Sequence, residues 1–352
     1  MQTRLLKIDR CNQETADLSA ACELLRKGEL VAFPTETVYG LGGNACDASA
    51  SARIYAAKGR PSDNPLIVHI AHKEDLSVVG RDVSEGAKKL ADAFWPGPLT
   101  IIVNRADIIP KETTGGLDSV AVRMPSDIIA NRLIDESGLF IAAPSANASG
   151  RPSTTRAEHC MEDLDGRIPM VIDGGPVKIG LESTIVDMSG DKPLILRPGF
   201  ITKEELEKVI PGIDFDPAVI ARVKNENIKA KAPGMKYRHY APKGELTIYE
   251  GDAELVIKTI NEKTAELKAL GKKTAVLATE ESKDFYTADF VASLGRRTDE
   301  EEIAVHLFEQ LRKFDEIGAD CIFAESFPQG GIGSAIMNRL MKAAGYRIIT
   351  LN

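Results

Sequence analysis

Short apolar runs alternate with helix-like stretches along the first two hundred residues. Helical patterning runs from about Thr15 to Gly28 and from about Ser49 to Lys58. The apolar runs between and after these stretches lie at 30–33, 66–70, 99–103, 119–124, 140–143, 170–173, 183–188 and 193–198. Short apolar runs separated by helical segments are typical of an α/β domain, and we predict a large twisted mixed sheet with helices.

The periodicity fades between Pro211 and Gly244, where prolines and lysines accumulate as in a connecting segment. Beyond it, apolar runs alternate again with helical stretches, which predicts a small Rossmann-like parallel sheet. We therefore predict three parts: a domain over residues 1–213, a linker over 214–243 and a second α/β domain over 244–352.

Charge is distributed unevenly over these three parts. The first and third carry a net charge of −6 each and the linker carries +4, within a total of −8. Proteins that grip the backbone of nucleic acids show a basic domain, whereas both large domains here are acidic. We expect no stable binding of nucleic acid.

Composition narrows the class of protein further. The chain is 43% hydrophobic and 27% charged, without the roughly 18 consecutive apolar residues of a membrane-spanning helix. Its five cysteines are widely spaced and form no C-x-x-C pair, so we expect reduced thiols and no zinc site. We also expect no metal site of the protein's own and a cytoplasmic location.

The stretch KGRPSDNP (58–65) concentrates polar groups at the end of a predicted helix. Pro61 prevents the helix from continuing, so Lys58 and Arg60 fall at its C-terminus, followed by Asn64. Cations there can simply be partners of the helix dipole. Two cations with an amide and a hydroxyl within seven residues also suit a polyanion such as a triphosphate.

Polar residues follow other predicted strands in the same way. AAPSANASGRPS (142–153) joins small residues, whose backbone N–H groups can form an anion-binding nest, to Ser145 and Ser153, although a plain serine-rich turn reads similarly. In FPTETVYGLGG (33–43) glycines allow positive φ and close backbone approach beside Thr35. The alternative for that stretch is a strand-to-helix connection with capping threonines.

Three arginines point to a shared anionic site. Arg60, Arg123 and Arg197 each stand near a proline, and the last two end apolar runs. Neither a G-x-x-x-x-G-K-[ST] nor a G-x-G-x-x-G motif is present, and no serine or cysteine nucleophile with a nearby base is evident. The pattern predicts an anion or nucleotide site of a different kind.

Six motifs in fixed order resemble the YrdC-like domain. They are FPTETVYGLG, KGRPSDNP, WPGPLT, VAVRMP, APSANASG and GLESTIVD, and PGMKYRHYAP (233–242) with the α/β domain after it resembles the two-domain form of the threonylcarbamoyl-AMP synthase family. The resemblance covers nearly the whole chain.

The resemblance implies an enzyme, a nucleotidyltransferase that condenses L-threonine, bicarbonate and ATP to L-threonylcarbamoyl-AMP, with Mg²⁺ accompanying the ATP. The product would feed the tRNA threonylcarbamoyl transferase machinery, which forms N6-threonylcarbamoyladenosine. The implied threonine-binding residues are Thr35, His69, Arg123, Ala143 and Ser183. The implied ATP-binding residues are Arg60, Asn64, Ser119, Ser145, Ser153 and Arg197, with Lys58 and Arg60 as catalytic phosphate clamps.

The basic segment 214–243 is expected to close over the nucleotide. Tyr237 and His239 lie on the same side of an extended chain and are predicted to reach phosphate oxygens together. The alternative is a solvated tether.

Two other functions stay open at this stage. One is a module that binds double-stranded RNA, which the acidic domains and the 5% aromatic content disfavour. The other is part of a carbamoyltransferase of hydrogenase maturation, for which the matching cysteine pattern is missing.

Overall fold

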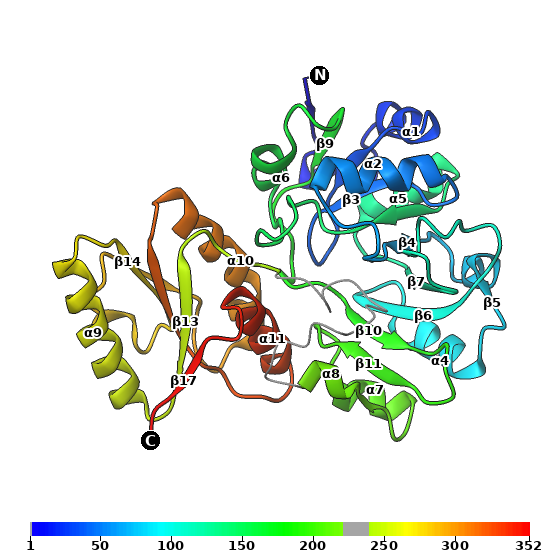
Figure 1. Ribbon diagram of the computed structural model, residues 1–352. Coiled ribbons are helices and arrows are strands. Elements are labelled where there is room, and N and C mark those ends of the chain that lie inside the picture. Colours follow the sequence, from blue (N-terminus) through cyan, green and yellow to red (C-terminus); the bar gives the residue numbers. More distant parts are fainter. Residues whose placement is uncertain (1, 221–238) are drawn as a thin grey trace. The chain divides into compact units, whose positions relative to one another are not determined.

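The computed structural model describes residues 2–220 and 239–352, which fall into two compact units (Figure 1). The first unit holds the described residues up to Ser149 and from Ser153 to Ile220. Residues Gly150–Pro152 group with the second unit, which contains everything described from His239 onward. Most of the predicted linker, Tyr237 included, lies outside the described residues.

The first unit contains a 12-stranded sheet with helices. Its strands are β1 (Arg4–Lys7), β2 (Val31–Phe33), β3 (Gly40–Asn44), β4 (Ile67–His69), β5 (Gly80–Arg81), β6 (Leu99–Arg105), β7 (Ser119–Arg123), β8 (Ile141–Ala143), β9 (Met170–Asp173), β10 (Thr184–Asp187), β11 (Leu194–Arg197) and β12 (Asp214–Phe215). Its helices are η1 (Arg10–Asn12), α1 (Ser19–Arg26), α2 (Ala48–Lys58), η2 (Lys73–Asp75), α3 (Leu76–Val79), α4 (Glu85–Phe94), α5 (Ile128–Ser137), α6 (Ala157–Leu164), α7 (Lys203–Val209) and α8 (Pro217–Ile220).

The predicted mixed sheet is confirmed, and each predicted apolar run of this unit contains a strand. The strand order is β1-β9-β2-β3-β8-β4-β7-β6-β10-β11-β12, with β5 paired to β6. Parallel pairs such as β4 with β7 stand beside antiparallel pairs such as β4 with β8. The sheet continues beyond residue 213, because β12 pairs with β11.

Helices cover the two faces of this sheet unequally. The largest core cluster joins α2, α3, α4, α6 and α7 to one face, through residues such as Ile54, Leu90 and Val122. On the other face, α1 and α5 pack on strands β2, β8 and β9. Farther along that face, a small cluster contains only strand residues, from β4, β6, β7, β10 and β11. Along these strands, every second side chain points away from the main core. These side chains form a second surface, and the small cluster on it contains no helix residue.

The glycine-rich stretch after β2 is itself a strand, β3, rather than part of a strand-to-helix connection. It pairs antiparallel with β2 and with β8. None of its glycines Gly40, Gly42 and Gly43 has a positive φ. The close approach is real, since a Cβ on Gly42 would lie 2.7 Å from the Phe33 ring and 2.8 Å from Ile141. Glycine here serves the packing of the sheet against α1 and α5.

The second unit is a five-stranded sheet with helices on both sides. Its elements are β13 (Glu245–Glu250), α9 (Ala253–Ala269), β14 (Thr274–Ala278), η3 (Lys283–Phe285), β15 (Phe290–Ser293), α10 (Glu300–Glu316), β16 (Cys321–Glu325), α11 (Gly333–Ala343) and β17 (Ile348–Thr350).

Every strand pair of this sheet is parallel, in the order β15-β14-β16-β13-β17, which confirms the predicted parallel-sheet domain. Figure 1 shows α9 on one side of the strands and α10 and α11 on the other. No helix in the described parts of the chain is long and apolar enough to cross a membrane.

Replacing Gly42 by alanine should destabilise the first unit. The added methyl group meets the buried Phe33 and Ile141 side chains, and overpacking of this kind costs about 1 to 3 kcal/mol. Gly190→Ala is the matched control, because nothing lies within 4 Å of its Cβ position. Urea unfolding followed by the fluorescence of Trp95, the single tryptophan, reports on the first unit. Equal midpoints for the two variants would contradict the packing role.

Candidate active site

The two central parallel strands of the first sheet separate the predicted residues into two groups. His69 and Arg123 end β4 and β7 and are register partners. Arg60 and Asn64 precede β4, and Ser119 begins β7. Two of the residues predicted to contact threonine, His69 and Arg123, therefore stand at the carboxyl ends of these strands, and three of those predicted to contact ATP stand at the amino ends.

Alternation along the strands places many of these residues on one face of the sheet. His69 and Arg123 pair across β4 and β7, and Ala143 pairs with Ile67, two residues from His69. Paired residues and residues two apart project from the same face. This is the face of the small cluster that contains Ile67 and Ala121 but no helix residue.

A buried ion pair organises the carboxyl end of these strands. The Arg123 guanidinium Nη2 lies 2.9 Å from Glu36 Oε1, with side chains only 5% and 6% exposed. Burial alone would raise the pKa of the Glu36 carboxyl, but the Arg123 charge, a hydrogen bond from Arg123 and hydrogen bonds from backbone N–H groups together outweigh it and hold that pKa below its ordinary value. The loop that carries Glu36 is fixed by backbone hydrogen bonds from Ile179 and Gly180 to the carbonyls of Glu36 and Thr37. Both partners of the pair are thus charged and held in place.

His69 lies beside this pair as a neutral imidazole. Burial, reinforced by the Arg123 charge, lowers its pKa from 6.5 to about 3. The ring Nδ1 is 3.1 Å from the carbonyl oxygen of Ile67, and the ring packs edge-on to Phe33 at 6.2 Å. At neutral pH the residue therefore offers hydrogen bonding without a charge.

Ser183 and Arg197 are brought together at the next strands. The Ser183 hydroxyl is 2.7 Å from that of Thr100, and Arg197 donates to the hydroxyl and the carbonyl of Ser183, both at 3.0 Å. The close approach of the chain depends on Gly199, where a Cβ would lie 2.3 Å from the Thr184 nitrogen. Arg197 was predicted on the ATP side and Ser183 on the threonine side, so this pair lies where the two groups of residues meet.

Lys58 and Arg60 leave α2 in different directions because of Gly59. This residue caps the helix in the left-handed conformation, with φ of 62°, so it ends the helix before Pro61 does. The Lys58 ammonium donates to the carbonyls of Ser145 and Asn147. Arg60 donates to the carbonyls of Asn64 and Pro65, at 3.3 and 3.1 Å. Both cations are buried and shape the loops that carry the predicted ATP-binding residues.

Side-chain hydrogen bonds hold the loop after β8, the loop before β10 and the loop after β2. Ser145 donates to the side-chain oxygen of Asn147, and the Ser153 hydroxyl donates to Glu182 Oε1 at 2.5 Å. The hydroxyl of Thr35 is 2.8 Å from that of Thr37 and donates to the Val38 carbonyl at 2.6 Å. Hydrogen bonds therefore join the loops of four motifs, FPTETVYGLG, KGRPSDNP, APSANASG and GLESTIVD. The contacts of these loops with substrates stay predictions.

Glu36 and Glu182 are not among the site residues predicted from the sequence. Each is an acidic residue inside a motif, and each is buried. A buried carboxylate needs a partner, but the sequence does not show which cation or hydroxyl will meet it.

Two predicted ATP ligands come from the linker. Tyr237 lies outside the described residues. His239 is buried in the second unit, where its ring lies 5.6 Å from that of Tyr240, which stacks on Phe308 of α10 at 5.1 Å. The predicted closure of this segment over a nucleotide is not tested by the described residues.

Among the residues that the structure describes, no three or more histidine, cysteine, aspartate or glutamate side chains are grouped to hold a metal ion. All five cysteines, each of which is described, are free thiols.

Replacing His69 by glutamine should flatten the pH dependence of stability. Between pH 6.5 and pH 3 the histidine is protonated in the unfolded chain but stays neutral in the folded protein. The free energy of unfolding that this residue contributes therefore falls as the pH falls. His69→Gln cannot titrate. From pH 7 to pH 4.5 the wild type should therefore lose about 2 to 3 kcal/mol more than the variant in urea unfolding monitored by Trp95 fluorescence. Parallel curves would show that His69 is not held neutral.

Comparisons with known proteins identify the family of this chain. A family model described as "Telomere recombination", for Sua5, YciO and YrdC, matches residues 23–199, and one described as "Threonylcarbamoyl-AMP synthase, C-terminal domain" matches residues 201–345. The chain is 51% identical to the threonylcarbamoyl-AMP synthase of Pyrococcus abyssi over 94% of both chains. It is also 51% identical to that of Bacillus subtilis, over 97% of this chain and 96% of the relative.

The crystal structure of P. abyssi Sua5 complexed with L-threonine superposes with a TM-score of 0.91 at 48% identity, over 99% of this chain and 100% of the other. Both domains and nearly the full length are matched. The chain belongs to the threonylcarbamoyl-AMP synthase family.

Proposed function

We propose that this enzyme condenses L-threonine, bicarbonate and ATP into L-threonylcarbamoyl-AMP, with release of pyrophosphate and water. The name of its relatives gives the product, and a relative has been solved with L-threonine. The observation that carries the proposal is that Arg60, Arg123 and Arg197, the three arginines predicted to bind anions, are all buried in the first unit. Carboxylate, carbamate and phosphate groups are the ligands that such guanidinium groups hold.

The two ends of β4 and β7 separate the two substrates. Threonine binds at the carboxyl ends, with its carboxylate directed to Arg123 and its side chain toward His69. ATP binds toward the amino ends, near Arg60, Asn64 and Ser119. The five residues of β7 span about 13 Å from Ser119 to Arg123, a length that leaves room for the reacting groups between the two sites.

The reaction needs positioning more than a protein nucleophile. The threonine amine adds to bicarbonate, and loss of water leaves a carbamate. A carbamate oxygen then forms a bond to the α-phosphorus of ATP, the bond from that phosphorus to the β-phosphate oxygen breaks, and the electron pair leaves with pyrophosphate. Arg60 and Lys58, with the loops they hold, orient the triphosphate and stabilise the departing charge.

Mg²⁺ enters with ATP in this proposal and is ligated mainly by phosphate oxygens and water, as is usual for this ion. The mixed anhydride that results is an activated carbamoyl donor. We propose that the machinery that modifies adenosine in tRNA consumes it.

The test is the release of pyrophosphate by the purified chain. Pyrophosphate should form only when ATP, Mg²⁺, L-threonine and bicarbonate are all present, and mass spectrometry should find the threonylcarbamoyl adduct of AMP. Release that continues without threonine would contradict the proposed reaction.

Replacing Arg60 by alanine should lower kcat/KM for ATP by about 30-fold to 1,000-fold, which corresponds to the loss of one charge-assisted clamp worth about 2 to 4 kcal/mol. Arg60→Lys should recover only part of the rate, since a lysine keeps the charge but not the fork. Arg4→Ala, at an exposed arginine of β1, is the matched control. Trp95 fluorescence checks that each variant is folded. Near-normal turnover of Arg60→Ala would remove this residue from the nucleotide site.

Selectivity among amino acids should follow the chemistry of the side-chain pocket. Serine lacks one methyl group and should be used roughly 10-fold to 200-fold less well than threonine. Valine lacks the hydroxyl, and a buried hydrogen-bonding partner left unsatisfied should reject it by roughly 10⁴-fold. Competition assays with the three amino acids measure both ratios. Equal use of valine and threonine would show that no group such as His69 binds the hydroxyl.

A further inference from the structure

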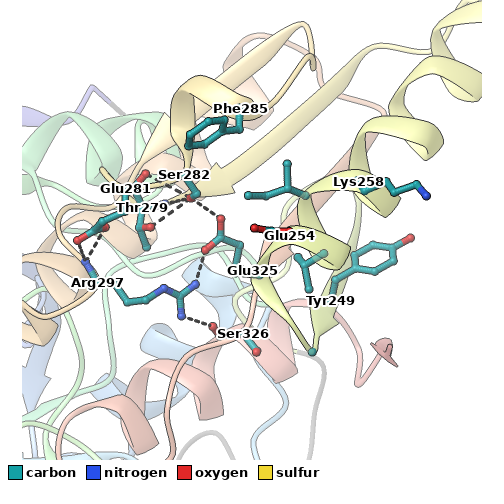
Figure 2. Close-up of a pocket in the computed structure, with 14 residues that line it drawn as sticks. Tyr249, Glu254, Lys258, Thr279, Glu281, Ser282, Phe285, Arg297, Glu325 and Ser326 are labelled. Carbon is teal, nitrogen blue, oxygen red and sulfur yellow. Dashed lines mark hydrogen bonds and ion pairs between the residues drawn. The ribbon is translucent and has the colours of Figure 1, made fainter. Parts of the chain in front are cut away.

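A pocket of about 690 Å³ lies in the second unit, outside the residues predicted to bind threonine and ATP (Figure 2). Such a volume suits a ligand of drug-like size. The lining residues all belong to this unit and are Tyr249, Gly251, Ala253, Glu254, Val256, Ile257, Lys258, Thr279, Glu281, Ser282, Phe285, Arg297, Glu325 and Ser326.

The pocket stands at the topological switch point of the parallel sheet. Strands β13 and β16 are neighbours, and the helices that follow them, α9 and α11, lie on opposite sides of the sheet. The pocket is lined by Tyr249 and Gly251 at the end of β13 and by Glu325 and Ser326 at the end of β16. Crevices at this position are where open α/β sheets bind their ligands.

A buried carboxylate forms the polar floor of the pocket. Glu325 is 5% exposed and accepts hydrogen bonds from the hydroxyls of Ser282 and Tyr286, the latter at 2.7 Å. Its other oxygen is paired with Arg297, which also donates to the Ser326 carbonyl at 3.0 Å. Figure 2 shows Ser282 and Arg297 turned toward this carboxylate. The floor is therefore a fixed array of hydroxyl, carboxylate and guanidinium groups.

The walls of the pocket are apolar and aromatic. Val256 and Ile257 come from α9 and Tyr249 from the end of β13. Phe285 also lines the pocket, yet 63% of its surface is exposed. A flat ring can stack on an aromatic side chain exposed in this way.

The charges around the pocket argue against a phosphate group. Two lining residues are basic, Lys258 and Arg297, and three are acidic, Glu254, Glu281 and Glu325. Hydrogen bonds from the Arg297 backbone N–H help to hold the pKa of the Glu281 carboxyl below its ordinary value, so this residue is an anion at neutral pH. A polyphosphate would meet a net negative lining.

We infer that this pocket binds a nucleoside without phosphate groups. Its base stacks on Phe285 against the apolar wall of α9, and its ribose hydroxyls bond to the polar floor at Glu325 and Ser282. A carboxylate at a strand end is the group with which dinucleotide-binding sheets hold ribose hydroxyls. The site is separate from the proposed binding of ATP, whose triphosphate is directed to arginines of the first unit.

Titrations of the full chain with adenosine, guanosine, cytidine and uridine test this assignment. Isoleucine δ1-methyl NMR locates the binding, because Ile257 lines the pocket and Ile67 belongs to the sheet of the first unit. At least one nucleoside should shift the Ile257 methyl signal with a Kd on the order of 0.1 mM, without shifting that of Ile67. The corresponding nucleoside monophosphate should bind at least tenfold more weakly at Ile257.

Two variants complete the experiment. Phe285→Ala should weaken the nucleoside at least tenfold, and since this side chain is exposed the variant should fold. Leu270→Ala removes another exposed apolar side chain of the same unit, outside the pocket, and should leave binding unchanged. The assignment is overturned if no nucleoside at 5 mM shifts the Ile257 signal, if the monophosphate shifts it equally well, or if Phe285→Ala binds as the wild type does. Because Arg60→Ala acts in the other unit, nucleoside binding that persists in it separates this site from the proposed ATP site.

Discussion

A guanidinium buried in a β-sheet needs a partner that satisfies its charge and its N–H groups, and for Arg123 in the first unit the Glu36 carboxylate is that partner. The pair connects the loop after β2 to the end of β7 and keeps both charges in the interior. It also affects His69, because the Arg123 charge adds to burial in keeping that imidazole neutral. Removing either partner would leave an uncompensated charge among apolar strands, which is among the most destabilising changes a core can undergo.

Arg123 of this pair lies on a part of the sheet face where the small core contains no helix residue. Helices α1 and α5 pack on β2, β8 and β9 but contribute nothing to the small core of β4, β6, β7, β10 and β11. Side chains on this part of the sheet face, His69 and Arg123 among them, belong to the surface that we propose to bind the substrates. An enzyme whose chemistry consists of holding several anions together can use such a surface without a nucleophile of its own.

The second unit solves a related problem in a different way. Glu325 is buried at the end of a central strand, and Arg297, Ser282 and Tyr286 satisfy it. Helices α9 and α11 lie on opposite faces of this sheet, and the pocket lies at the ends of the strands that precede them. The Glu325 carboxylate forms its floor. The two units thus keep charged groups at strand ends, where the sheet topology leaves room for ligands.

The pattern of the chain predicts most strands of the first unit, the two α/β domains and the candidate loops, because alternation of apolar runs and helices is a local property of the chain. It also places Arg60, Arg123 and Arg197 near prolines, the last two at the ends of apolar runs. It does not predict the strands β1, β5 and β12. It did not show that the stretch with Gly40 and Gly42 is a strand. Glycine is needed there because the Phe33 and Ile141 side chains leave no room for a Cβ, and not because the backbone makes a turn. Only the tertiary structure decided that Glu36 pairs with Arg123, that Glu182 holds Ser153, and that the 690 Å³ pocket exists. These features depend on strand order and on contacts between residues far apart in the chain, which local pattern does not encode.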